Sequence, residues 1–318
     1  MANMHLKKIR LFIFYFNFAL LFCFNTILCH SMPLNGNIDI DFSSEELKCW
    51  IENRTVKISV ERGSVRNVGS GFIYCMKLKS NIIPIIVTNR HVVENGRKII
   101  LSIIATEKSG KKGKKSLIDY EIPAKFNKWI FHPESDVDIA IIIFDNIIND
   151  IEKKYNNLSF NCINDSINIS QKDFDNMMTF EDIAVSSYHI NDSDPNLEDL
   201  KILFGEIIIN EKNDIFNNYK IFTNIDIGIG SAGSPVFLYS NNNFYYTKHG
   251  IVAGNRIILV GVLAYTLQYR GQSLMPIEIP THSDQNVVFV DTKSGYIINS
   301  YKLESFKAIL NDLLRNSH

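Results

Sequence analysis

The stretch Gly230-Ser231-Ala232-Gly233-Ser234-Pro235-Val236-Phe237 stands between isoleucine-rich segments of the chain. Its two glycines, small side chains and proline predict a tight turn whose backbone amides face outward. A turn of this kind can present a nucleophilic side chain and amide donors to the same point. We therefore expect a general base and an acid that orients it elsewhere in the sequence.

Two upstream segments carry such groups. Residues 85–93 read Ile-Ile-Val-Thr-Asn-Arg-His-Val-Val and place His91 just after a strand pattern. Residues 136–143 read Asp-Val-Asp-Ile-Ala-Ile-Ile-Ile and place Asp138 at the edge of another. A carboxylate at the edge of an apolar strand is partly desolvated and needs a partner, which an imidazole N–H supplies. Asp136 is the rival, because it lies two residues earlier on the same face of an extended segment.

The order histidine, aspartate, glycine turn is one of the chain orders in which Ser-His-Asp triads occur. The three segments, together with Gly-Ser-Gly-Phe-Ile at residues 69–73, resemble those of trypsin-like serine peptidases of the chymotrypsin fold. Within that family they are most similar to the bacterial HtrA-like branch, and the resemblance covers residues 56–264. It implies that His91 is the general base. It also implies that Asp138, which stands directly before Ile-Ala as in the Asp-x-Ala pattern of the family, orients His91.

The resemblance implies an oxyanion hole at Gly230, Ser231 and Ala232, but it fails at the nucleophile. The family has its serine three residues before the proline, and that position here is Ala232. A methyl group has no proton to give and no lone pair to attack with, and loss of the nucleophile costs about six decades in turnover. Ser231 and Ser234 flank the position, but neighbours on a tight turn point in different directions. The alanine is either natural or a replacement for a functional serine.

The resemblance also implies the walls of a specificity pocket. Asp226 stands six residues before Ala232, like the pocket-floor acid of trypsin, and Ala264 lies in the segment that resembles the other wall. A buried Asp226 would favour an arginine or lysine side chain by charge pairing. The alternative is that Asp226 faces solvent. Ser231 replaces the aspartate that pairs with a freed N-terminus, so activation by N-terminal cleavage is not expected.

The first residues have the pattern of a targeting segment. Three basic residues precede an apolar run at residues 11–28, and small residues follow it. This pattern predicts a signal segment over residues 1–31, a polar linker over residues 32–44, and a secreted or periplasmic protein. The alternative is an uncleaved membrane anchor through residues 11–28, which are nearly long enough to span a bilayer.

Short runs rich in β-branched residues, bounded by turn residues, favour strands along most of the remaining chain. With the resemblance they predict an all-β fold of two antiparallel six-stranded barrels and a C-terminal helix. The expected peptidase domain covers residues 45–318. It divides into a first barrel (45–150), a connection with an insertion (151–199), a second barrel (200–300) and the helix (301–318). No PDZ module is expected after that helix.

Composition narrows the partners and cofactors. The chain has 318 residues and a formal net charge of -1, which does not favour nucleic acid as a partner. No Cys-x-x-Cys or His/Cys pair has zinc spacing, so we expect neither a metal nor a cofactor.

Three cysteines follow the signal segment, namely Cys49, Cys75 and Cys162. Because the number is odd, at least one of them lies outside any intramolecular disulfide. The basic run at residues 108–115 is interpreted as a solvated hairpin tip, with contact to phosphate, lipid or an acidic partner as the alternative.

These patterns together predict a secreted trypsin-like homologue that keeps the base, the orienting acid and the oxyanion-hole backbone but lacks the nucleophile. Such a pseudoprotease would bind peptide or protein segments in its cleft by adding them to a strand edge. The first alternative is an active serine endopeptidase, through a rearranged turn or with the alanine in place of a functional serine. The second alternative is an envelope or surface interaction protein with a vestigial cleft.

Overall fold

A computed structural model describes most of the chain after residue 43. The described residues are 44–79, 81–108, 114–155, 158–174, 177, 180–190, 198–209, 220–225, 227–240, 244–247, 250–253, 256–270, 273–282 and 291–315. The expected signal segment and linker, the middle of the basic run and Asp226 lie outside them. Within these ranges, no helix combines the length and the apolar character needed to cross a membrane.

The first half of the chain forms a nine-stranded, mostly antiparallel sheet. Its strands are β1 (Thr55–Arg62), β2 (Val65–Lys77), β3 (Ile82–Thr88), β4 (Lys98–Glu107), β5 (Lys115–Glu121), β6 (Ile130–Phe131), β7 (Ala140–Ile143), β8 (Leu158–Ser159) and β9 (Ile163–Asn164). The order is β5-β4-β1-β2-β3-β7-β6, with β8 paired to β4 and β9 paired to β2. The strands β3 and β7 are almost wholly apolar because both lie inside the sheet, where most of their side chains are buried.

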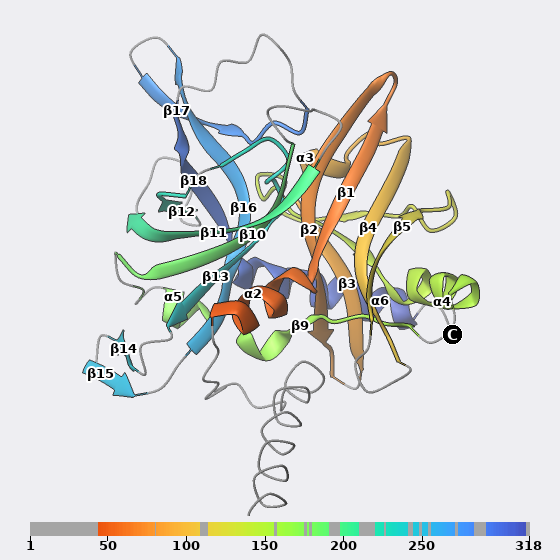
Figure 1. The fold of residues 1–318 in the computed structure, drawn as a ribbon, viewed down its shortest axis with the longest axis horizontal. Coiled ribbons are helices and arrows are strands. Elements are labelled where there is room, and N and C mark those ends of the chain that lie inside the picture. The colour runs from red at the N-terminus through yellow and green to blue at the C-terminus, as the bar shows by residue number, and fades with distance from the viewer. Residues whose placement is uncertain are drawn as a thin grey trace, which may run out of the picture.

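The second half forms a seven-stranded antiparallel sheet beside the first (Figure 1). Its strands are β10 (Asp182–Ile190), β11 (Glu198–Ile209), β12 (Lys220–Thr223), β13 (Pro235–Ser240), β16 (Arg256–Arg270), β17 (Ser273–Glu278) and β18 (Asp291–Asn299). The order is β13-β10-β11-β12-β18-β16-β17, and β13 also pairs with β16. Six strands therefore form a ring, and β17 is added outside it.

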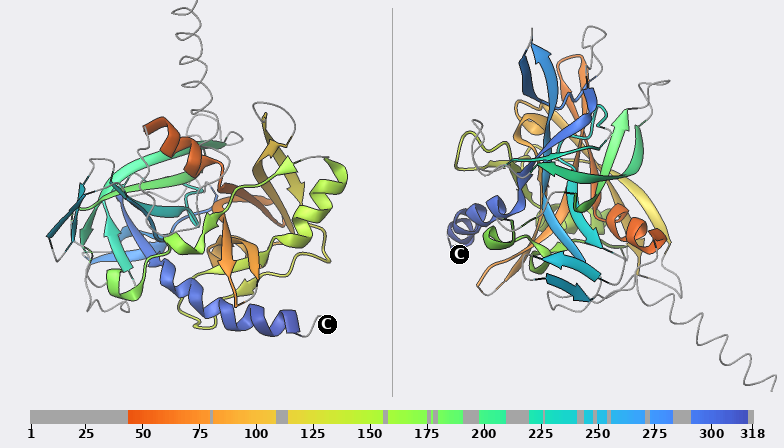
Figure 2. Two further views of the ribbon diagram at one scale, coloured as in Figure 1. Left: turned by 90° about the horizontal axis from the view of Figure 1, so that it is seen from below. Right: turned by 90° about the vertical axis from the view of Figure 1, so that its left-hand side faces the viewer.

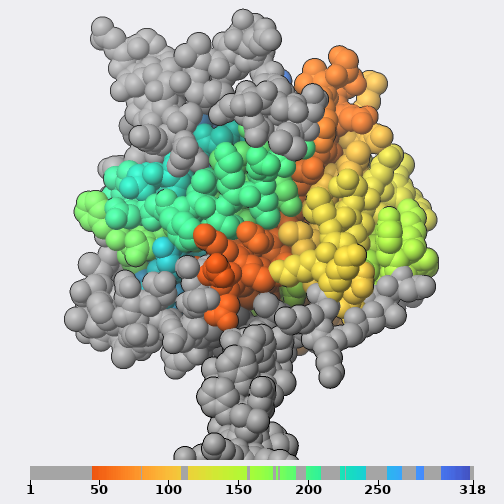
Figure 3. Space-filling view, viewed as in Figure 1, coloured from red at the N-terminus to blue at the C-terminus, as the bar shows by residue number. Residues whose placement is uncertain are grey.

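Helices lie around the two sheets. They are α2 (Ser44–Glu52), α3 (Arg90–Val93), α4 (Asp145–Lys154), η1 (Asp165–Ile167), α5 (Gln171–Phe174), η2 (Ser300–Ser305) and α6 (Phe306–Arg315). In Figure 3 the orange-red α2 lies where the green strands of the second sheet meet the yellow strands of the first. Phe306 and Leu310 of α6 belong to the same buried cluster as Ile85 of β3, and Figure 2 shows α6 alongside the first half of the molecule. The C-terminal helix therefore packs on the body of the protein.

A disulfide joins Cys75 of β2 to Cys162, just before β9. It ties the segment that leaves the first sheet back to the middle of that sheet. Cys49 of α2 stands outside the disulfide, in agreement with the odd cysteine number, although the sequence had not indicated which two would pair.

The structure differs from the expected organisation in three places. β10 lies in the range expected to be a connection, yet it pairs along its full length with β11 and also with β13. Residues 244–247 (β14), expected in the second barrel, pair only with β15 (Gly250–Ala253) in a separate two-stranded sheet. The strand numbers are nine and seven rather than six and six, because the two-residue strands β6, β8 and β9 join the first sheet and β17 extends the second. The coarser expectation of a β-rich fold with two antiparallel sheets and a C-terminal helix is confirmed.

Candidate functional site

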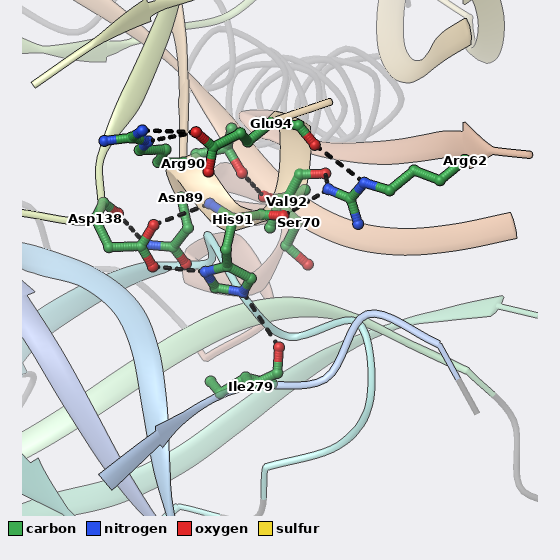
Figure 4. A network of polar contacts seen from close by, with 10 residues as sticks. Arg62, Ser70, Asn89, Arg90, His91, Val92, Glu94, Asp138 and Ile279 are labelled. Atoms are coloured by element: carbon green, nitrogen blue, oxygen red, sulfur yellow. Dashed lines mark hydrogen bonds and ion pairs between the residues drawn. The ribbon is translucent and has the colours of Figure 1, made fainter. Parts of the chain in front are cut away.

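His91 lies in α3, a single helical turn that follows β3 directly. The guanidinium of Arg62, at the end of β1, donates to the carbonyls of His91 at 2.6 Å, Val92 at 2.8 Å and Glu94 at 3.0 Å. These bonds satisfy carbonyls that a helix end leaves without an intrahelical partner. Figure 4 shows Arg62 on the side of this turn away from the imidazole. The backbone position of His91 is thus fixed by β3 before it and by Arg62 behind it.

The carboxylate of Asp138 holds the ring and the backbone of His91. Oδ2 of Asp138 lies 2.5 Å from Nδ1 of His91, and Oδ1 accepts a bond of 2.9 Å from the backbone N–H of His91. The side chain of Asn89 donates to the carbonyl of Asp138 at 2.7 Å. Asp138 is buried, whereas its rival Asp136 is exposed. The structure thus brings His91 together with Asp138, the carboxylate that sequence reasoning preferred.

This environment changes the protonation of His91. Burial lowers the pKa of His91, but the hydrogen bond and charge of Asp138, the charge of Glu278 and the carbonyl of Ile279 together raise it above its usual value. Nε2 of His91 lies 3.2 Å from the carbonyl oxygen of Ile279 (Figure 4). Both ring nitrogens therefore face oxygen acceptors, an arrangement that suits the doubly protonated imidazolium.

The glycine turn is held against β2. Gly230 and Gly233 have φ angles of +95° and +88°, in the region that favours glycine. A Cβ on Gly233 would lie 2.1 Å from the carbonyl oxygen of Ser70. The backbone N–H of Ser70 donates to the carbonyl of Ala232 at 2.7 Å, and its hydroxyl donates to the carbonyl of Gly230 at 2.9 Å. The two glycines thus permit a close approach that any larger residue would prevent.

Among the described residues, neither serine hydroxyl of the turn is hydrogen-bonded to His91. Ala232 is fully buried. The hydroxyl of Ser231 donates to the carbonyl of Gly228 at 2.7 Å and is used within the turn. The hydroxyl of Ser234 is buried and has no hydrogen-bond partner among the described residues. The site therefore contains the His91–Asp138 pair, and the position expected for the nucleophile carries the methyl group of Ala232.

Two strand edges flank the histidine. The backbone N–H of Val68 on β2 donates to the carbonyl of Thr281 at 2.6 Å, and the carbonyl of Ala264 on β16 accepts from the N–H of Ile279 at 3.1 Å. We call the N–H of Val68, the N–H of Gly230, the carbonyl of Ala264 and the ring of His91 the strand site. Its groups come from both sheets, so the site exists only where the two sheets meet.

The expected specificity pocket is described only in part. Ala264, one expected wall residue, is fully buried on β16. Asp226, the expected floor residue, lies outside the described residues, and its role stays a prediction. The side chain of Ile279 belongs to the same buried apolar cluster as Ala232 and Leu263. The N–H of Ile279 is bonded to the carbonyl of Ala264, so a buried aliphatic residue lies next to that expected wall.

One group of ligand atoms could accommodate a metal ion. Donor atoms of His91, Asp138 and Glu278 lie within 4.8 Å of one another. However, Nδ1 of His91 already donates to Asp138, and Glu278 is exposed. A metal bound at Nδ1 would have to break that pair, so these residues fit an acid–base pair better than a metal centre.

Sequence reasoning missed Arg62, Ile279 and Pro280. Arg62 carries no motif, and only the folded chain places it behind the histidine turn. Residues 277–280 read Ile-Glu-Ile-Pro, and the alternation of apolar and charged residues is a strand signal that could have identified β17. Nothing in that pattern indicates that Ile279, the residue just after β17, lies beside His91.

The comparisons with known proteins concern the fold. No protein family and no curated protein matches the sequence. The structure is similar to an HtrA-type protease with a tripeptide, at 12% identity and a TM-score of 0.47, over 84% of this chain and 64% of that one. It is similar to the Rv3671c protease from M. tuberculosis in its active form (13%, TM-score 0.41, 81% of each chain) and to the serine endoprotease from Yersinia pestis (15%, TM-score 0.44, 88% and 69%). The chain thus spans slightly less than two thirds of the length of the HtrA-type protease.

Proposed function

We propose that this chain is a secreted trypsin-like serine endopeptidase homologue, of the HtrA-like branch, that binds extended peptide or protein segments without hydrolysing them. The observation that carries the proposal is the contrast at the strand site. Its backbone groups hold an extended segment beside His91, while the nucleophile position carries the methyl group of Ala232. Binding and catalysis are thus separated in the same site.

Binding follows from the geometry of β16. Its register continues antiparallel into the strand site, with Thr266 opposite Ile277 and Tyr265 opposite Glu278. Strand addition uses main-chain hydrogen bonds for affinity, and the pockets for alternate side chains give specificity. A site of this kind accepts many sequences in one backbone conformation, which is what a peptide-binding protein needs.

The missing chemistry is equally specific. In a serine peptidase a hydroxyl attacks the carbonyl, the histidine takes its proton, and backbone N–H groups stabilise the oxyanion. Here His91 and Asp138 supply the base, and Gly230 is the expected N–H donor. Ala232 has no hydroxyl, so acyl transfer should be about 10⁶-fold slower than with a serine.

The proposal extends to architecture and localisation. The ring of six strands in the second sheet supports a chymotrypsin-like barrel in that half of the expected domain, which begins at residue 45. Secretion is supported by the signal pattern over residues 1–31. The N-terminal sequence of the protein from a secreting host tests this: a start near residue 32 supports cleavage, and an intact N-terminus supports the anchor.

The experiment that tests the function compares the chain with Ala232→Ser. Both are treated with a fluorophosphonate probe and with a peptide library, and His91→Ala combined with Ala232→Ser serves as the control. We expect no labelling of the chain as it stands, labelling and cleavage by Ala232→Ser, and loss of both in the control. Binding of library peptides to the unmodified chain is measured in parallel.

Two outcomes would contradict the proposal. If the unmodified chain labels and cleaves, it is an active endopeptidase, and Ser231 or Ser234 has to be tested as nucleophile. If Ala232→Ser folds but neither labels nor binds a peptide, the site is vestigial. Function would then lie on the outer surface, as in the second alternative.

A further inference from the structure

The strand site is already occupied by the chain's own residues 279–281. The N–H of Ile279 donates to the carbonyl of Ala264 at 3.1 Å, and the carbonyl of Ile279 faces Nε2 of His91 at 3.2 Å. Ile279 follows β17, which pairs antiparallel with β16 along its whole length. Figure 4 shows the carbonyl of Ile279 approaching the imidazole from the side of the second sheet. The residue that follows the β16–β17 hairpin, Ile279, therefore lies beside His91.

The next two residues complete the occupation. The carbonyl of Pro280 accepts from the N–H of Gly230 at 3.2 Å, and the carbonyl of Thr281 accepts from the N–H of Val68 at 2.6 Å. Thr281 is buried, and its hydroxyl donates to the side chain of Asn67 at 2.9 Å. Every backbone group of the strand site is therefore used by the chain itself.

The side chain of Ile279 anchors this segment. It is 1% exposed and shares a buried apolar cluster with Ile227, Ala232 and Leu263. The preceding residue, Glu278, is exposed. A branched aliphatic side chain gains from burial at this position, whereas a lysine or arginine would lose its hydration unless a buried acid paired with it.

An internal strand competes strongly with an external one. A segment tethered by a short connection has an effective concentration on the order of millimolar. The affinity measured for an external ligand is reduced by the fraction of molecules in which the site is open. A ligand therefore has to displace residues 277–281, and it does so best when it offers the same anchor.

We propose that residues 277–281 occupy the strand site as an internal competitor that an external ligand displaces. The external ligand is an extended peptide with a branched aliphatic residue at the position that Ile279 occupies. This inference rests on the proposed peptide-binding function. It adds to that function a ligand preference and a built-in restraint on binding.

The first test measures binding of a labelled peptide with the sequence of residues 275–282, Met-Pro-Ile-Glu-Ile-Pro-Thr-His, by fluorescence anisotropy. The proteins are the wild-type chain, Ile279→Ser and the matched control Ile277→Ser, whose side chain is only partly buried on the same segment. We expect Ile279→Ser to bind the peptide at least tenfold more tightly than the wild type, with a smaller change for the control. A peptide carrying Ile279→Arg should bind at least tenfold more weakly than the native peptide.

A second test does not depend on the stability of Ile279→Ser. Thr266 and Ile277 are directly opposite each other on β16 and β17. Opposite residues of antiparallel strands have Cα atoms about 4.5–5.5 Å apart, which suits a disulfide. In Thr266→Cys combined with Ile277→Cys, the oxidised protein should bind no peptide, and mild reduction of the same sample should restore binding.

The outcomes separate this inference from the function on which it rests. Equal peptide binding by wild type, Ile279→Ser and the oxidised double variant would show that residues 277–281 do not block the strand site. The proposed peptide-binding function would not be affected by that result. Tighter binding of the Ile279→Arg peptide would overturn the aliphatic anchor. If no peptide binds to folded Ile279→Ser or to the reduced double variant, the peptide-binding function fails as well.

Discussion

Nδ1 of His91 lies 2.5 Å from Oδ2 of Asp138, and the opposite ring nitrogen of His91 faces a backbone carbonyl instead of a hydroxyl. In a serine peptidase the corresponding pair serves the nucleophile. On the proposed function, the pair here serves no nucleophile. Its measurable effects are on the protonation of His91 and on the stability of the fold.

We therefore predict that stability falls as the pH rises through the folded-state pKa of His91. That pKa is raised above its ordinary value, so the native state keeps a proton that the unfolded chain has lost. The stabilisation is fully present below about pH 6.5, the pKa of an unperturbed histidine, and is lost above the folded-state pKa. In Asp138→Asn this pH dependence should flatten, and the unfolding free energy in acid should fall by about 1–3 kcal/mol. Urea unfolding from pH 5.5 to pH 8.5 measures both effects.

The control for this prediction is Asp136→Asn, because Asp136 is exposed two residues away. It should leave the pH profile unchanged. Parallel profiles for the wild type and Asp138→Asn would show that the Asp138 carboxylate does not set the pKa of His91.

The second prediction concerns the glycine turn. A Cβ on Gly233 would lie 2.1 Å from the carbonyl oxygen of Ser70 and 2.3 Å from the hydroxyl of Thr88, at a φ of +88°. Gly63 has a similar φ of +65° but no atom within 4 Å of an added Cβ. Gly63→Ala should cost about 1–2 kcal/mol from the left-handed conformation alone, and Gly233→Ala should cost about 3 kcal/mol or more because the clash is added. Equal losses in urea unfolding would mean that the turn is not packed against β2.

The third prediction concerns the disulfide between Cys75 and Cys162, which closes a loop with a sequence separation of 87. A loop of this length restricts the unfolded chain strongly, so replacing both cysteines by alanine should cost roughly 2–5 kcal/mol. Cys49→Ala, outside the disulfide, should cost much less. Thermal unfolding with and without a reductant provides the check, and a wild-type Tm that does not change on reduction would argue against the bond.

Much of the site could be predicted from the sequence because its parts lie at strand ends. His91 follows β3 and Asp138 precedes β7, and these two strands are neighbours in the first sheet. Their register places Thr88 opposite Ala140, so the residues just beyond each end meet. The strand patterns therefore located both residues, and the resemblance to the trypsin-like family selected His91 and Asp138 as the pair.

The missed elements depend on long-range contacts. β10 contains Ser186 and Ser187, both fully buried, which hide its apolar pattern. Ser186 is buried because its hydroxyl accepts a bond of 2.7 Å from Thr55, in the other sheet. The approach of Ile279 to His91 also depends on how the two sheets meet. Local hydrophobic periodicity carries no information about the packing of one sheet against another.

The fourth prediction concerns Arg62, which positions His91 from behind. Arg62→Met keeps much of the side-chain volume but leaves the carbonyls of His91, Val92 and Glu94 without their donor, so we expect a loss of about 1–3 kcal/mol. Arg62→Lys should recover only part of it, because an ammonium cannot reproduce the fixed fork of the guanidinium. The matched control is Arg66→Met, in which the replaced arginine side chain is 49% exposed and bonds to Glu198.

A purely structural role of Arg62 would lower only the stability of the fold. A positioning role also shifts the NMR resonances and the pKa of the His91 imidazole, and in the Ala232→Ser background it should lower kcat more than it raises KM. An unchanged His91 titration in folded Arg62→Met would show that β3 alone positions the histidine.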